Sequence, residues 1–222
     1  MSSWAVIPAL ASMLAASGVG AVEIYSDFPR AIHTEERYVI YSHGRIGEGT
    51  DPQPVHPAWG VYRFPEIKQR LFEGGDFNLI AYQRPKNADF VHHSELLESW
   101  VRRLIDAGVK PSRITLIGFS RGGHLAAYAS AKLASSGINT ALLGACTDGD
   151  ISAQSPLALG GNVLSIFETS DTALSCSELG KRSELASFEE VAITTGREHG
   201  AFFQPREEWL SPLKAWISRT NR

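Results

Sequence analysis

The sequence has few cysteines and no excess of basic residues. Its 222 residues include only Cys146 and Cys176, and 21 basic side chains stand against 24 acidic ones, for a formal net charge of −3. Two cysteines cannot enclose a zinc ion and are not spaced as a redox pair, so they are either buried thiols or one disulfide. The charge balance provides no basic surface for nucleic acid or an anionic membrane. We therefore expect no nucleic-acid partner and no stable membrane association of the mature chain.

Charged side chains are also absent from residues 1–21. This segment is apolar over residues 4–16 and ends in Val-Gly-Ala, small residues that a signal peptidase accepts. It is too short and too rich in small residues for a membrane span. We expect a signal peptide at 1–21 and a periplasmic or secreted protein. A cytoplasmic protein with a packed N-terminal segment is the alternative, because the segment has no Lys or Arg and contains Pro8. Export makes a Cys146–Cys176 disulfide plausible.

Linkers, repeats and low-complexity tracts are missing from residues 22–222, which we expect to form one domain. Short β-branched runs alternate there with amphipathic stretches, a pattern typical of a parallel sheet flanked by helices. About six strands are predicted, at 37–42, 77–82, 114–119, 140–145, 163–168 and 190–195. Helices are predicted at 65–72, 94–107, 121–134 and 207–219. The interval between 145 and 163 has no helical periodicity and leaves no room for a cap domain.

The sharpest chemical signal is the segment Gly118-Phe119-Ser120-Arg121-Gly122. It joins an apolar strand to an Ala-rich helix, and a serine on such a turn projects its hydroxyl at the carboxyl edge of the sheet. The helix N-terminus then directs its dipole and the amide of Arg121 at a developing oxyanion. Ser120 is therefore the predicted nucleophile.

Seven histidines compete for the role of base. In a strand-turn-helix arrangement of this kind the acid and then the histidine follow the serine in the chain, which selects His199, after the last predicted strand. His124 lies one turn into the helix and is expected to be a packing or surface residue. His92 and His93 are expected to be exposed ahead of a helix, and no carboxylate-rich set accompanies them, so no metal site is predicted.

The acid is predicted at Asp171, which follows the strand before the histidine's own strand. Its carboxylate would hold the imidazole tautomer and stabilise the imidazolium. Asp148 and Asp150, one strand earlier, are the alternatives. Glu168 lies too far inside its strand.

A second oxyanion donor is expected from the backbone amide of Arg45, because Gly44 permits a close approach after the strand that ends at His43. His43 itself is expected to be structural. The segment from Arg45 to residue 64 is expected to overhang the site. Four aromatic side chains are predicted to form the pocket walls: Trp59, Tyr62, Phe119 and Phe202. The alternative for each is packing in the core.

The order of these segments over residues 35–220 resembles the α/β-hydrolase superfamily. The stretches RPKNAD (84–89) and GFSRGG (118–123) are similar to those of small bacterial α/β hydrolases without a lid. The resemblance implies a serine hydrolase with Ser120, Asp171 and His199 in the roles given above. No Gly-Gly-Gly run follows His43 and no cap is inserted, which disfavours bulky lipid substrates.

The predicted reaction is two-step acyl transfer to water from a small-molecule ester or thioester of small to medium acyl groups. It requires no metal and no organic cofactor. The alternatives are an acyltransferase or an amidase on the same triad, and a non-catalytic binding module with this fold.

Overall fold

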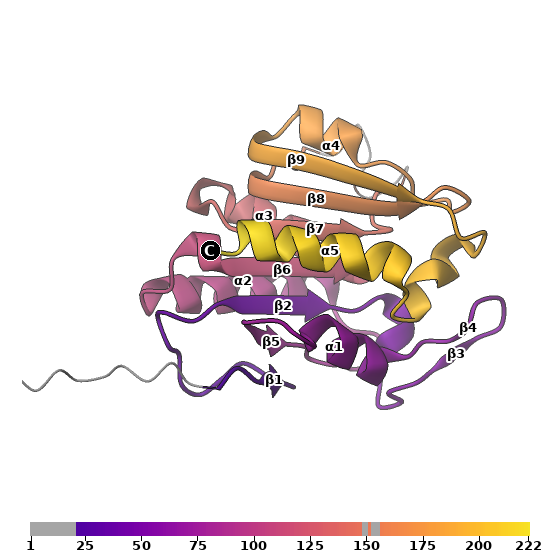
Figure 1. Cartoon of the computed structure of the whole chain (residues 1–222), viewed down its shortest axis with the longest axis horizontal. Coiled ribbons are helices and arrows are strands. Elements are labelled where there is room, and N and C mark those ends of the chain that lie inside the picture. Colours follow the sequence, from indigo (N-terminus) through magenta and orange to yellow (C-terminus); the bar gives the residue numbers. More distant parts are fainter. Residues whose placement is uncertain (1–20, 148–150, 152–155) are drawn as a thin grey trace, which may run out of the picture.

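The computed structural model describes residues 21–147, 151 and 156–222. All but the last residue of the predicted signal peptide, and both alternative acids Asp148 and Asp150, lie outside the described residues. Seven parallel strands form one sheet in the order β1-β5-β2-β6-β7-β8-β9 (Figure 1). The strands are β1 (Ile24–Tyr25), β2 (Tyr38–Ser42), β5 (Asn78–Ile80), β6 (Ile114–Phe119), β7 (Asn139–Leu143), β8 (Gly160–Glu168) and β9 (Glu184–Ile193).

Helices cover both faces of the sheet (Figure 1). On one face lie α1 (Phe64–Phe72) and α5 (Glu207–Thr220), and on the other α2 (Phe90–Asp106) and α3 (Arg121–Lys132). The short helix α4 (Ser177–Lys181) packs near β9. The short 3-10 helices are η1 (Arg45–Gly47), η2 (Pro111–Arg113), η3 (Ala134–Ser136) and η4 (Glu198–Phe203). The predicted α/β fold with a mostly parallel sheet is confirmed.

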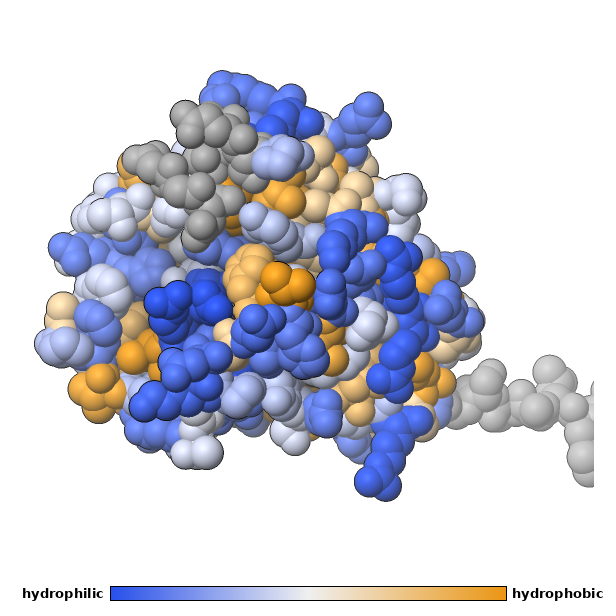
Figure 2. All heavy atoms as spheres, turned by 180° about the vertical axis from the view of Figure 1, so that it is seen from behind, coloured by the Kyte–Doolittle hydropathy of each residue, from blue (hydrophilic) through white to orange (hydrophobic). Residues whose placement is uncertain are grey.

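The core follows the period-two alternation of the strands. In β2, Val39 and Tyr41 join the apolar cluster beneath α1 and α5, whereas Tyr38 and Ile40 join the cluster beneath α2 and α3. Both clusters are buried, which explains why the central strands are apolar without interruption in sequence. The α2 and α3 face is largely hydrophilic on its outside, with small scattered apolar spots (Figure 2).

Two predicted elements, α2 and β9, begin four or more residues earlier than expected. Strand β9 starts at Glu184, whereas the apolar pattern predicted a start at residue 190. It is an edge strand that is partly exposed along its length, so it tolerates glutamates that interrupt the apolar run. Helix α2 starts at Phe90 because the Asp89 side chain caps it, accepting a hydrogen bond from the His92 amide at 2.7 Å. His92 and His93 therefore lie inside the helix, and His93 is buried rather than exposed.

Antiparallel strands β3 (Val55–His56) and β4 (Gly60–Val61) form a small hairpin that was not predicted. The hairpin belongs to the connection between β2 and α1, so this segment reaches beyond the sheet edge (Figure 1). No helix in the part of the chain described here combines the length and apolarity that a membrane crossing requires.

Cys146 and Cys176 form a disulfide, with their Cα atoms 5.3 Å apart. The bond joins the segment after β7 to the residue that precedes α4, and both sulfurs lie in a third apolar cluster beside β7 and β8. The predicted pairing is confirmed.

Candidate active site

Ser120 occupies the sharp turn between β6 and α3. Its backbone is in the left-handed region, with φ 53° and ψ −123°. A Cβ on Gly122 would lie 2.0 Å from the carbonyl oxygen of Ser42, and one on Gly118 would lie 2.2 Å from that of Gly122. Glycine is therefore required on both sides of Ser120, because any side chain there would clash with the backbone. The predicted turn between a strand and a helix at this segment is confirmed.

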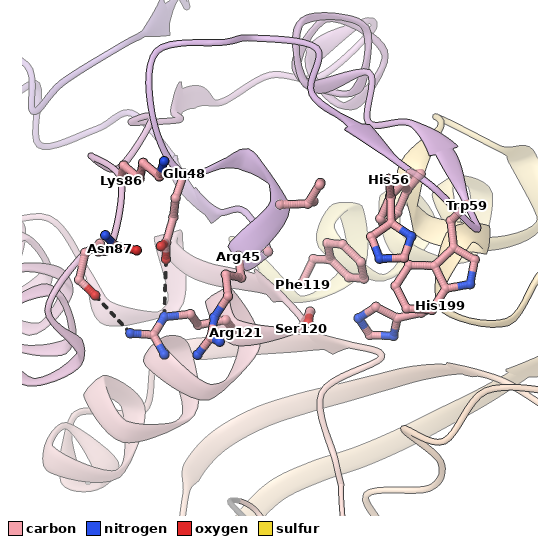
Figure 3. A pocket seen from close by; sticks show the side chains of 14 residues that line it. Arg45, Glu48, His56, Trp59, Lys86, Asn87, Phe119, Ser120, Arg121 and His199 are labelled. Carbon is pink, nitrogen blue, oxygen red and sulfur yellow. Dashed lines mark hydrogen bonds and ion pairs between the residues drawn. The ribbon is translucent and has the colours of Figure 1, made fainter.

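His199 and Asp171 lie next to each other on loops that follow β9 and β8. The Nδ1–H of His199 donates to Oδ2 of Asp171 at 2.6 Å. The Asp171 side chain is 4% exposed, and its other oxygen accepts from the Thr172 amide at 2.7 Å. With Nδ1 committed to the carboxylate, the remaining ring nitrogen of His199 is available on the side of Ser120 (Figure 3).

Glu168, at the end of β8, connects the two loops. Its buried carboxylate accepts hydrogen bonds from the amide and hydroxyl of Thr195, at 2.8 and 2.7 Å, and from those of Ser170, at 3.3 and 3.0 Å. Ser170 Oγ in turn accepts from the Glu198 amide at 3.2 Å. Burial alone would raise the pKa of Glu168, but these hydrogen bonds outweigh it and lower that pKa. The ionised carboxylate therefore braces the segments that carry Asp171 and His199. Only the fold brings these donors together, so sequence reasoning missed this role.

A pocket of about 660 Å³ opens above Ser120 and His199 (Figure 3). Of the predicted wall residues, Trp59 and Phe119 line it, and their rings lie 5.3 and 4.9 Å from the His199 ring, centroid to centroid. Tyr62 and Phe202 do not line it. Both are buried in the cluster beneath α1 and α5, where the Tyr62 hydroxyl lies 3.1 Å from that of Tyr41.

The same pocket includes both residues whose amides were predicted as oxyanion donors. Arg121 is the first residue of α3, whose amide has no partner within the helix. Arg45 begins η1, and both residues line the pocket beside Ser120.

Arg84 lies buried beneath the pocket, where it connects the end of β2 to the segment that carries Glu48. Its buried guanidinium donates to Ser42 Oγ at 2.9 Å and to the carbonyl oxygen of His43. It also lies 3.6 Å from the Glu48 carboxylate, which is 3.2 Å from Nε of Arg121. Burial lowers the pKa of Arg84 to about 10, so it remains charged at neutral pH. The sequence signal was the RPKNAD stretch, but nothing in it indicates which partner Arg84 takes.

His43 has the structural role predicted for it. Its Nδ1–H donates to the Gly44 carbonyl oxygen at 2.8 Å, and Nε2 accepts from the Arg84 amide at 2.9 Å. Burial, and next the charge of Arg84, lower the pKa of His43 to about 3. Neutral His43 thus fixes the loop that leads to Arg45.

The remaining histidines carry no arrangement typical of a metal site. His124 Nε2 lies 2.8 Å from the carbonyl oxygen of Ala145, half-buried on α3. Among the residues described, no three His, Cys, Asp or Glu side chains gather in a way that would hold a metal ion.

Comparison with known proteins indicates the same type of fold. The model of the phospholipase/carboxylesterase family matches residues 74–172, which include Ser120 and Asp171. The chain has the α/β-hydrolase fold. This family match supports a hydrolase that acts on esters in general. None of the curated proteins matches the chain.

Solved structures share the fold of this chain at low sequence identity. EstE7, an HSL homologue from a metagenome library, is 14% identical, with 86% of this chain and 80% of that one covered and a TM-score of 0.60. The monoacylglycerol lipase of Paleococcus ferrophilus is also 14% identical, with 82% and 94% covered and a TM-score of 0.58. Arabidopsis thaliana SOBER1 is 15% identical, with 84% and 100% covered and a TM-score of 0.54. At these identities the likeness shows the fold.

The lowered pKa of His43 predicts a specific pH dependence of stability. Native His43 stays neutral down to about pH 3, whereas the same residue in the unfolded chain takes up a proton near pH 6.5. The contribution of neutral His43 to the free energy of unfolding is therefore complete above pH 6.5. It decreases as the pH falls toward 3, by about 1.4 kcal/mol per pH unit. His43→Gln should reduce that slope of the free energy of unfolding between pH 4 and 6, measured by urea denaturation.

His92→Gln is the matched control, because it replaces an exposed histidine on α2. Equal slopes for His43→Gln and the unmodified protein would contradict the assignment of a neutral, buried His43.

Proposed function

We propose that the protein is a serine hydrolase that cleaves carboxylic esters or thioesters of small to medium acyl groups. The observation that carries the proposal is the 2.6 Å contact between Asp171 and His199, which lines one pocket together with Ser120 on its strained turn. This is the arrangement that activates a serine hydroxyl: nucleophile, base, and a carboxylate that orients the base.

In the first half of the reaction, His199 accepts the proton of Ser120 as Oγ attacks the carbonyl carbon. The backbone amides of Arg121 and Arg45 stabilise the oxyanion of the tetrahedral intermediate. Asp171 stabilises the imidazolium that forms on His199. When the intermediate collapses, the imidazolium gives its proton to the departing alcohol or thiol, and the acyl group remains on Ser120.

In the second half, His199 removes a proton from water, which attacks the acyl-enzyme. Collapse of the second intermediate returns that proton to Ser120 Oγ and releases the carboxylic acid. All proton transfers use groups of this chain and one water molecule.

Replacement of the proposed catalytic residues should abolish turnover. Ser120→Ala and His199→Ala should each lower kcat for p-nitrophenyl butyrate by roughly 10³-fold or more, because the two residues act as a unit. Asp171→Asn should lower kcat far more than Asp148→Asn. Retention of more than about a tenth of the activity by Ser120→Ala would contradict the assignment. A fluorophosphonate should label the unmodified protein at one site and leave Ser120→Ala unlabelled, which separates an enzyme from a binding module.

Acyl-chain preference is the second expectation. The pocket of about 660 Å³ is the size of a small-molecule site, and no cap domain is predicted. We expect kcat/KM to be higher for butyryl than for palmitoyl p-nitrophenyl esters, with no activation at a lipid interface. Faster turnover of the palmitoyl ester would be incompatible with this substrate range.

We also propose that the chain is exported and that residues 1–21 are removed. The disulfide supports this, because such bonds persist in oxidising compartments. Protein isolated from its native compartment should begin at or near Val22 by intact mass and release no thiol on denaturation until it is reduced. An intact Met1, or two thiols titrated before reduction, would count against export.

A further inference from the structure

The two ends of the pocket differ in chemistry, with Ser120 between them and His199 at one end (Figure 3). On the His199 side lie aromatic rings: His56 stacks on Trp59 at 4.1 Å between centroids, and Phe203 meets Trp59 edge-on at 5.6 Å. Glu198, which does not line this pocket, accepts a hydrogen bond from Trp59 Nε1 at 3.2 Å. The opposite end contains charged side chains.

The opposite end has an excess of positive charge. Arg45, Lys86 and Arg121 line it together with one acidic residue, Glu48, and Arg84 lies buried beneath. The Glu48 carboxylate is shared between two guanidiniums, at 3.2 Å from Arg121 and 3.6 Å from Arg84. Four cations and one carboxylate therefore stand at this end of the pocket, and the carboxylate pairs with two of the four.

Arg45 and Lys86 are the cations that remain for a ligand. Both are exposed at the pocket rim, and neither forms an ion pair with an acidic side chain of the residues described. Asp89 caps α2, where its Oδ1 accepts from the His92 amide, and it does not line the pocket. Figure 3 shows the Arg45 side chain extending alongside that of Arg121, on the side of Ser120 away from His199.

The direction of proton transfer indicates which end of the pocket holds the alcohol part of an ester and which end holds its acyl part. The leaving oxygen must come within hydrogen-bond reach of His199, which protonates it. The alcohol or thiol part therefore lies at the aromatic end. The carbonyl oxygen occupies the space near the amides of Arg45 and Arg121, so the acyl chain takes the remaining direction, toward the cationic end.

We propose that the acyl group of the substrate carries a carboxylate, so that the preferred substrates are half-esters of dicarboxylic acids with an aromatic or apolar alcohol part. The inference rests on the proposed function and adds the substrate class. Arg45 and Lys86 contact the distal carboxylate, while Glu48 keeps Arg121 and Arg84 in place. Guanidinium and ammonium groups at a pocket rim are the usual partners of such a carboxylate.

The test compares three benzyl esters that differ only at the far end of the acyl chain. They are the monobenzyl ester of adipic acid, the neutral benzyl ester of 6-methylheptanoic acid and the cationic benzyl ester of 6-aminohexanoic acid. We expect kcat/KM to be at least about tenfold higher for the anionic ester than for the neutral one, and lowest for the cationic ester. The preference should decrease as salt is added.

Variants then locate the preference within the pocket. Lys86→Glu and Arg45→Glu should each lower the anionic-to-neutral ratio of kcat/KM by about tenfold or more. Lys110→Glu makes the same charge change at an exposed residue before β6, at the opposite edge of the sheet from Ser120, and should leave the ratio unchanged. The ratio cancels a general loss of activity or of folded protein.

The outcomes separate the two levels of the proposal. Hydrolysis of all three esters at similar rates, or a ratio unaffected by both pocket variants, overturns the half-ester inference and leaves the ester hydrolase intact. Failure to hydrolyse any of the three esters overturns the half-ester inference, and failure on p-nitrophenyl butyrate as well overturns both. A charge preference that disappears in Lys86→Glu and persists in Lys110→Glu supports the inference.

Discussion

The contact between the first turn of α3 and the end of β2 is the constraint on which the site depends. A Cβ on Gly122 would lie 2.0 Å from the Ser42 carbonyl oxygen, so the helix approaches the sheet only because position 122 has no side chain. This approach requires Ser120 to adopt a positive φ, a strain of order 1–3 kcal/mol that the buried strands around it must offset. The result is a serine hydroxyl held at the sheet edge beside free helix amides, with little freedom to rearrange.

Two buried charged groups position everything else around that serine. Glu168 connects the loops after β8 and β9, and Arg84 connects the end of β2 to the loop that carries Glu48. A buried charge is tolerable when hydrogen bonds and an opposite charge compensate its lost hydration, and here those partners come from separate segments of the chain. Both sides of the pocket are therefore complete only when the whole sheet is formed, which couples the geometry of the site to the stability of the fold.

The features that sequence reasoning predicted correctly are those encoded locally. The central strands are continuous apolar runs, and the Ser120 turn has a steric signature within five residues, so both are visible without a structure. Asp171 beside His199 follows from chain order in this type of fold. Helix α2 and strand β9 were predicted too short because polar residues interrupt the apolar pattern near their starts, His92 and His93 in α2 and Glu184 and Ser187 in β9. The capping Asp89 and the edge position of β9, respectively, make those residues compatible with the element.

The pocket walls were less predictable because they depend on the direction of each side chain. Trp59 and Tyr62 are three residues apart, yet Trp59 lies over His199 whereas Tyr62 is buried against Tyr41 and α1. Arg84 and Glu48 are likewise 36 positions apart in sequence, and only the parallel pairing of β2 with β5 brings their loops together. A nucleophile that needs one strained turn can be recognised from a short motif. The groups proposed to select a substrate come from several loops that connect strands to helices. Which of them meet in the pocket therefore depends on the fold and cannot be predicted from a short motif.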